Sequence, residues 1–198
     1  MVEKTIPVAS GRWRWRDRFV VNFNLHGGMV PSSVSVVYTP TNTEVARPVT
    51  CTMPHGSRVN PSGAHQYSTC MMDDQLVEID RNQWAITRRF KTGRGPYNLA
   101  VTPDGKLLIA FLKQGHEVQI FDLATGANVM QAKSSTTLTH GVAVSHDSRY
   151  AFVSCEGVGA APGKVDVYDL RALTRVASVD VGQQASGIAF WKQEPAAR

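Results

Sequence analysis

The 198-residue sequence has no long apolar run and no segment with a sustained helical hydrophobic period. A membrane-spanning helix needs about 18 or more consecutive apolar residues, and no segment reaches that length. The opening residues Met1-Val2-Glu3-Lys4 lack the basic region, apolar stretch and small-residue cleavage site of a secretory signal. The sequence therefore predicts an all-β domain with no membrane span.

Cysteine is scarce, with only Cys51, Cys70 and Cys155 in the chain. No two of them form a Cys-x-x-Cys pair, which excludes the usual spacings of zinc sites, thiol redox motifs and haem attachment. Their odd number and irregular spacing do not indicate a disulfide scaffold. We predict that Cys70 and Cys155 are small buried hydrophobic residues in their strands.

Familiar catalytic motifs are also absent. The sequence contains no Gly-x-Ser-x-Gly nucleophile elbow and no His-Glu-x-x-His zinc motif. The glycine-rich residues 157–164 are followed by Val165, where a phosphate-binding loop needs Ser or Thr. No catalytic residue and no particular cofactor can be assigned, so whether the protein is an enzyme stays open.

What the sequence does contain is a repeat. One position of the repeat is occupied by Pro54-His55-Gly56, Pro96-Tyr97-Asn98, Thr139-His140-Gly141 and Ala185-Ser186-Gly187. A turn follows each of the first three, at Pro61-Ser62-Gly63, Pro103-Asp104-Gly105 and His146-Asp147-Ser148, and the units close at Asp80, Asp122 and Asp169. A period of roughly 40–45 residues built from short strands is typical of a β-propeller blade.

Each unit contains four short apolar strands. In the unit that follows Gly95, strands are predicted over 98–102, 107–112, 118–121 and 128–132. Proline presets φ for a turn, aspartate can bond its following backbone and glycine accepts positive φ, so the connecting turns have a physical basis. Asp122 and Asp169 are predicted to cap such turns. The fold class is therefore an all-β propeller of four-stranded antiparallel blades.

The strand count predicts about four blades in one partial propeller that spans 1–198. The predicted parts are 1–10 as the last strand of a preceding blade, 11–53 as a diverged blade, 54–93, 94–137 and 138–181 as regular blades, and 182–198 as a closing strand and tail. An open arc leaves strand edges bare. The missing blades can come from an upstream segment or from a second chain, or the arc can survive with open edges.

Ten apolar residues in these strands are predicted to be buried between blades, because they alternate or run continuously as packed strands do. They are Leu99, Val101, Leu108, Ile120, Val142, Val144, Phe152, Val167, Ile188 and Phe190.

Residues 93–106 and 118–126, which carry the Pro-Tyr-Asn, Pro-Asp-Gly and Phe-Asp-Leu elements, resemble the YVTN (YncE-like) β-propeller repeat family. The ending 187–192 looks like the closing strand of such proteins, and the resemblance covers most of 54–192. It implies a ring of about seven blades, of which this chain matches the C-terminal half. It also implies export to the periplasm or the cell surface. Related propeller families include lactonases and proteins with a modified haem.

A basic strip lies near the start of the chain, where arginines alternate with two tryptophans. The arginines are Arg12, Arg14, Arg16 and Arg18. In a strand, this period of two places them on one face, as a surface for a partner or an anion, or simply as a solvated face opposite packed tryptophans. Four arginines on one strand are too few for a nucleic-acid footprint, so no nucleic-acid partner is predicted.

Histidine is the most chemically suggestive residue type. His55 and His140 occupy the same repeat position, just before the innermost strand, where propeller loops converge on the channel mouth. His26 lies in a loop of the diverged blade and is expected near the same face. Because neutral imidazole binds zinc, copper and iron, these three residues form a candidate metal site. Tyr97 replaces histidine in the unit between them, so the series is incomplete.

Two functions are compatible with these features. The first is a non-catalytic binding scaffold, in which loops 25–33 and 157–163 recognise a protein partner or a small ligand at the channel mouth. The second is an oxidoreductase or lactonase-like hydrolase that holds a metal or haem-like group at the channel through His55 and His140. Because a fold alone is a weak argument for catalysis, the scaffold is favoured.

Overall fold

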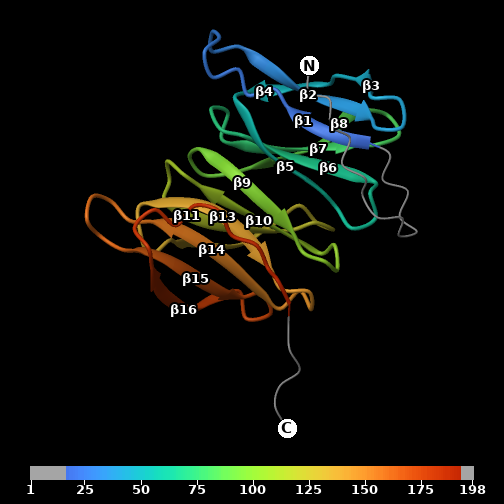
Figure 1. The fold of residues 1–198 in the computed structure, drawn as a ribbon. Helices are drawn as coiled ribbons and strands as arrows, with labels where there is room; N and C mark the ends of the chain where they lie inside the picture. Colours follow the sequence, from blue (N-terminus) through green and yellow to red (C-terminus); the bar gives the residue numbers. More distant parts are fainter. Residues whose placement is uncertain (1–16, 193–198) are drawn as a thin grey trace.

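The computed structural model describes residues 17–192. The strands of this part form four stacked sheets (Figure 1). Each sheet has four strands, and neighbouring strands are antiparallel. The described residues contain sixteen strands and no helix. The predicted all-β architecture with about four propeller blades is confirmed.

The three regular blades have their strands in chain order across the sheet. Blade 2 consists of β5 (Pro54–Val59), β6 (His65–Cys70), β7 (Gln75–Asp80) and β8 (Ala85–Lys91). Blade 3 consists of β9 (Pro96–Val101), β10 (Leu107–Leu112), β11 (Glu117–Asp122) and β12 (Asn128–Lys133). Blade 4 consists of β13 (Leu138–Val144), β14 (Tyr150–Glu156), β15 (Gly163–Asp169) and β16 (Thr174–Val181).

Blade 1 departs from this pattern. Its strands are β1 (Asp17–Val21), β2 (Pro31–Tyr38), β3 (Thr43–Ala46) and β4 (Val49–Thr52). Both β3 and β4 pair with β2, at opposite ends of that strand, so together they form one interrupted strand. This interruption accounts for the divergence of residues 11–53 from the regular repeat. The strand predicted over 1–10 lies outside the described residues.

Asp122 and Asp169 cap the turns that follow them, as predicted. The Asp122 carboxylate accepts hydrogen bonds from the Thr125 backbone N–H at 2.7 Å and from its hydroxyl at 2.8 Å. Asp169 likewise accepts from the N–H groups of Arg171 and Ala172. These bonds tie each hairpin turn to the end of the preceding strand and are local to each blade.

Apolar clusters fill the spaces between neighbouring blades. The cluster between blades 3 and 4 includes Ile109, Phe111, Ile120, Val153 and Tyr168, all completely buried. A second cluster joins blades 2 and 3. The predicted buried residues Leu99, Leu108, Ile120 and Val142 belong to these clusters. Continuous apolar runs in the second and third strands therefore arise because those strands are covered on both faces.

The cysteine prediction was wrong in one respect. Cys51 of β4 and Cys70 of β6 form a disulfide that joins blade 1 to blade 2, with their Cα atoms 5.6 Å apart. Cys155 is a free, buried thiol, as expected. Spacing along the chain gave no sign of the disulfide, because the two cysteines meet across two different sheets.

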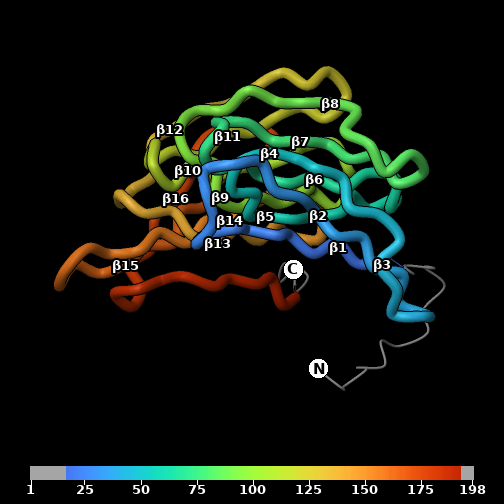
Figure 2. Tube along the Cα trace, turned by 90° about the horizontal axis from the view of Figure 1, so that it is seen from above, coloured from blue at the N-terminus to red at the C-terminus, as the bar shows by residue number. Residues whose placement is uncertain are grey.

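Blade 4 ends the stack with an open face. The segment 182–192 contains no strand, although a strand was predicted over 186–191. It nevertheless lies beside β13, because the Ser154 hydroxyl donates to the Ser186 carbonyl at 2.6 Å and a Cβ on Gly141 would come within 2.6 Å of the same oxygen. Figure 2 shows this segment in red, along the side of the molecule that carries β1, β5 and β13. A strand needs a pairing partner, and the described chain supplies none there.

Several predicted core residues are therefore only half-buried. Phe152 stacks on Phe190 with ring centroids 5.9 Å apart, yet both remain partly accessible, as do Val167 and Ile188. Val101 and Val144 are also of intermediate exposure. For the residues of blade 4 the cause is that no further blade of the described chain covers this face.

The two ends of the blades differ. We use the name loop face for the end with the loops 22–30, 71–74, 113–116 and 157–162, on the left of Figure 1. The opposite end, named the turn face, carries the hairpin turns 60–64, 81–84, 102–106 and 123–127. Among residues 17–192 there is no helix that is long and apolar enough to cross a membrane.

Candidate functional site

The loop face carries a row of stacked rings at the starts of the innermost strands. His55 stacks on Tyr97 with ring centroids 3.8 Å apart, and Tyr97 lies 5.6 Å from His140. Phe23, from the loop before β2, meets the edge of His55 at 5.0 Å. The equivalent repeat positions therefore come together as the sequence predicted, with Tyr97 between the two imidazoles.

Hydrogen bonds and charges hold this row in place. His55 Nδ1 lies 3.0 Å from the Tyr97 carbonyl oxygen, and the Lys113 ammonium lies 4.4 Å from the centre of the Tyr97 ring. Burial lowers the pKa of His55, and the charges of Lys113 and His140 lower it further, against the hydrogen bond to Tyr97, which raises it. His140 Nε2 lies 3.7 Å from a Glu156 carboxylate oxygen. The row is therefore an aromatic surface with the Lys113 ammonium beside it.

The metal hypothesis gains no support from this geometry. Tyr97 separates His55 from His140, and His26 is exposed in the loop 22–30. Within 17–192 no three His, Cys, Asp or Glu residues are grouped so that they can hold a metal ion. A metal site at His55, His140 and His26 therefore stays a prediction, which native mass spectrometry with His55→Ala as the comparison can test.

The loop face also carries exposed apolar side chains. Leu25, Met29 and Val30 in the loop 22–30 are each more than half exposed, and so is Val158 in the loop 157–162. Met72, in the turn between β6 and β7, is also exposed. Three different blades thus present apolar loop residues at the same end of the molecule.

Most of the predicted basic strip cannot be placed. Arg12, Arg14 and Arg16 lie outside the described residues. Arg18 is exposed in β1, and its guanidinium donates to the Asp17 carbonyl at 3.3 Å. Whether the strip acts as a partner or anion surface stays a prediction.

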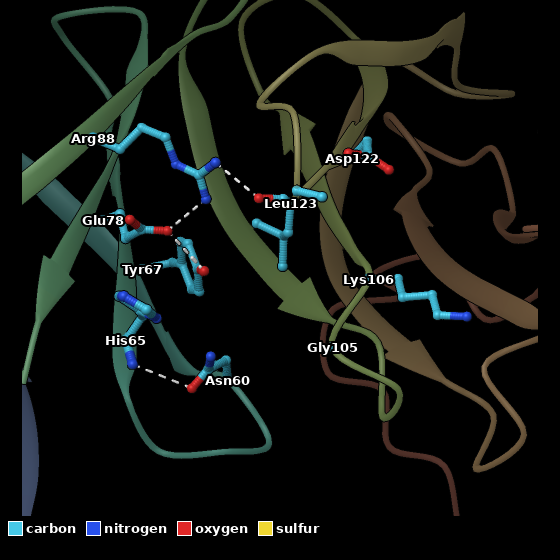
Figure 3. A pocket seen from close by; sticks show the side chains of 10 residues that line it. Asn60, His65, Tyr67, Glu78, Arg88, Gly105, Lys106, Asp122 and Leu123 are labelled. Carbon is cyan, nitrogen blue, oxygen red and sulfur yellow. Dashed lines mark hydrogen bonds and ion pairs between the residues drawn. The ribbon is translucent and has the colours of Figure 1, made fainter.

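A polar groove on the turn face was not predicted. It lies between blades 2 and 3 and has a volume of about 480 Å³ (Figure 3). The residues that line it are Asn60, His65, Tyr67, Glu78, Arg88, Gly105, Lys106, Asp122, Leu123 and Ala124. In Figure 3 the blade 2 side chains form one wall, and Gly105, Lys106 and Asp122 of blade 3 lie across the opening.

A buried carboxylate organises the blade 2 wall. Glu78 accepts hydrogen bonds from the Tyr67 hydroxyl at 2.9 Å, from Arg88 at 2.6 Å and from the Thr87 hydroxyl at 3.0 Å. The other terminal nitrogen of Arg88 donates to the Leu123 carbonyl of blade 3 at 2.8 Å. Arg88 therefore ties the buried charge of one blade to the backbone of the next.

These contacts shift the pKa values of Glu78 and Tyr67. Burial alone would favour the neutral acid, but the bonds from Arg88, Tyr67 and Thr87 outweigh it, so the pKa of Glu78 lies below its ordinary value. Burial and the charge of Glu78 together raise the pKa of Tyr67. At neutral pH the groove wall therefore holds an ionised Glu78, a cationic Arg88 and a neutral phenol.

The polar residues of this wall have apolar counterparts in blade 3. The residues 42 positions later, in blade 3, have the same strand pairings: Tyr67 opposite Glu78 corresponds to Ile109 opposite Ile120. The full correspondence is His65 with Leu107, Tyr67 with Ile109, Glu78 with Ile120 and Arg88 with Met130. In blade 3 these positions pack in or against the apolar cluster facing blade 4. Polar residues at repeat positions that are apolar in the next blade are therefore the signal that can locate the groove from the sequence.

Acid should weaken the groove wall. Because the folded state holds the pKa of Glu78 below its ordinary value, this group stabilises the fold above the unfolded-state pKa of about 4.3. That stability is lost as the pH falls below about 4 and through the folded-state pKa. We expect urea unfolding of the wild type to lose more stability between pH 7 and pH 3 than the variant Glu78→Ile/Arg88→Met. Equal losses would contradict this role of Glu78.

The stacked four-stranded sheets, with their innermost strands meeting at the loop face, define a β-propeller fold. A hydrazine synthase from Kuenenia stuttgartiensis has a similar structure, with a TM-score of 0.73 and 20% sequence identity. The match covers 79% of this chain and 45% of that chain, so this chain spans less than half of that protein. At this identity the likeness shows the fold alone. No family model matches the sequence, and neither does any curated protein.

Proposed function

We propose that this propeller acts as a binding scaffold whose loop face recognises a partner protein. The observation that supports it is the set of exposed apolar residues on loops of three blades, at the same end of the molecule as the stacked rings of His55, Tyr97 and His140. Exposed apolar side chains gathered at one end of a protein are typical of interaction sites. Rigid blades that carry variable loops suit this role, because the scaffold fixes the geometry of the recognition surface.

Site-specific photo-crosslinking in the producing cells tests this proposal. A crosslinking residue at Met29, Met72 or Val158 should give the same discrete protein adduct. The same residue at Asn82 or Arg171, which are exposed on the turn face, should not give it. Replacing Met29 and Val158 by serine should reduce the adduct formed from position 72. The same adduct from both faces, or none from the loop face, would contradict the proposal.

The closed form of the propeller is part of the same proposal. The half-buried Phe152 and Val167 of blade 4, with Phe190 in the segment beside β13, suit a further blade packed there. A ring of about seven blades, as in YVTN-type repeat proteins, would cover them, with the extra blades from an upstream segment or a second chain. The similarity in fold to less than half of a longer chain is in line with this closure.

An oxidising location, in the periplasm or outside the cell, completes the proposal. Its support is the disulfide between Cys51 and Cys70, since disulfides persist in such compartments and are rare in the reducing cytosol. Labelling of free thiols in freshly broken cells tests this location. We expect both cysteines to be protected, and their full labelling before any reductant is added would contradict it.

A further inference from the structure

The polar wall of the groove between blades 2 and 3 is difficult to explain by stability. Glu78 and Arg88 stand where blade 3 has Ile120 and Met130. Replacing a buried ion pair with well-packed apolar residues is often neutral or stabilising, because desolvation of the charges offsets their attraction. Blade 4 has Val167 and Ala177 at the corresponding places, so the apolar solution is available to this repeat. The ion pair of blade 2 therefore points to a role other than holding the blades together.

The groove has the size of a small-molecule site. Its volume of about 480 Å³ lies within the ~300–1,000 Å³ typical of ligand pockets. The Tyr67 ring, Leu123 and Ala124 give it an apolar part, next to the polar groups at its opening. A ligand with a compact apolar body and one polar group would match this lining.

The unsatisfied groups at the opening are mainly hydrogen-bond donors. Glu78 already accepts three hydrogen bonds, so it has little capacity for a ligand. His65 Nε2 lies 3.8 Å from Asp80, which is too far for a hydrogen bond. Among the described residues, no hydrogen-bond acceptor engages the Asn60 side-chain amide nitrogen or the Lys106 ammonium, whereas the Asn60 side-chain oxygen accepts two bonds.

Of the two carboxylates that line the groove, Glu78 is buried and Asp122 is engaged through its Oδ1. The Asp122 carboxylate caps its own turn through the backbone and the hydroxyl of Thr125. The buried Nε of Arg88 has no hydrogen-bond partner and adds a further donor to the wall. The balance of free groups therefore favours an anion that can accept hydrogen bonds from His65, Asn60 and Lys106.

We propose that this groove binds a small organic carboxylate, with its apolar body against Tyr67 and Leu123 and its carboxylate near His65 and the Asn60 amide. The Lys106 ammonium would attract it from the blade 3 side. The site is on the turn face, at the opposite end of the blades from the stacked rings. It is therefore independent of the partner surface proposed for the loop face, and either proposal can fail without the other.

Titrations with three probes of the same shape test the ligand class. Benzoate, benzamide and benzylammonium share an aromatic body and differ in charge. Calorimetry or NMR of the intact chain should show saturable binding of benzoate, about tenfold or more tighter than that of benzamide, with benzylammonium weakest. Preferred binding of benzylammonium would show that Asp122 dominates, and would overturn the proposal. So would the absence of saturable benzoate binding.

Two single substitutions locate the site. His65→Leu installs the residue found at the equivalent position of blade 3, and Lys106→Gln removes an exposed charge without touching the core. Each should weaken benzoate binding about tenfold, whereas Lys91→Gln, an exposed lysine of β8 outside the groove, should leave it unchanged. If His65→Leu fails to fold, Lys106→Gln alone decides. Equal effects of Lys106→Gln and Lys91→Gln would show non-specific attraction and would overturn the proposed site.

Discussion

Replacing Arg88 by methionine should lower the free energy of unfolding by about 3 kcal/mol, although methionine is the residue found at the same position of blade 3. The loss arises because Glu78, whose side chain is only 7% exposed, would keep its charge without its main partner. The substitution also removes the hydrogen bond from Arg88 to the Leu123 carbonyl, which crosses between blades. Urea unfolding at neutral pH measures the change.

Arg89 provides the matched control. It is the next residue along β8, it is exposed, and its contact is one long hydrogen bond of 3.5 Å to the Thr50 carbonyl. Arg89→Met should therefore change the free energy of unfolding by less than about 0.5 kcal/mol. If both substitutions cost the same, the network around Glu78 does not stabilise the charge as described.

Removing the disulfide should have a comparable effect. The bond between Cys51 and Cys70 closes a loop with a sequence separation of 19 residues, and its loss should cost about 3 kcal/mol through the freer unfolded chain. It also fastens the diverged blade 1 to blade 2. We expect Cys51→Ala/Cys70→Ala to unfold at lower urea concentration, with blade 1 the first part to lose protection in hydrogen exchange.

A reducing agent provides the control for this variant. Under strong reduction the wild-type protein should approach the stability of Cys51→Ala/Cys70→Ala, while the variant should not change. A wild type that loses no stability when its thiols are shown to be free would contradict a stabilising disulfide.

The repeat made most of the fold predictable. The third strand of each regular unit ends at Asp80, Asp122 or Asp169. These aspartates therefore define the register of the strands before them. Leu108 and Ile120 were placed in the core correctly, because both faces of their strands meet another blade. Phe152 is less buried than expected, because its face of blade 4 has no neighbouring blade in the described chain.

The disulfide could not be predicted because its two residues have different contexts. Cys70 lies in a regular blade and has a counterpart in Cys155, which is a buried free thiol. Cys51 lies in β4, in the blade where the repeat register is interrupted. Without that register, nothing in the sequence places Cys51 beside β6.

The sequence predicted part of the site on the loop face but did not predict the groove on the turn face. The repeat correctly aligned His55 and His140 at one end of the molecule, but their chemistry depended on Tyr97, whose ring stands between them. The groove was missed because His65 and Glu78 are unremarkable polar residues when read alone. They become informative only against Leu107 and Ile120, their apolar counterparts one repeat later.

Blade 2, we infer, carries polar residues for a ligand where the same repeat otherwise builds an apolar interface. The unfolding free energy of the variant His65→Leu/Tyr67→Ile/Glu78→Ile/Arg88→Met, measured with urea, tests this most directly. We expect a stability within about 1 kcal/mol of the wild type or higher, because the variant repeats the interface of blades 3 and 4. A loss of more than about 3 kcal/mol would contradict it, by showing that the polar wall is needed to hold blades 2 and 3 together.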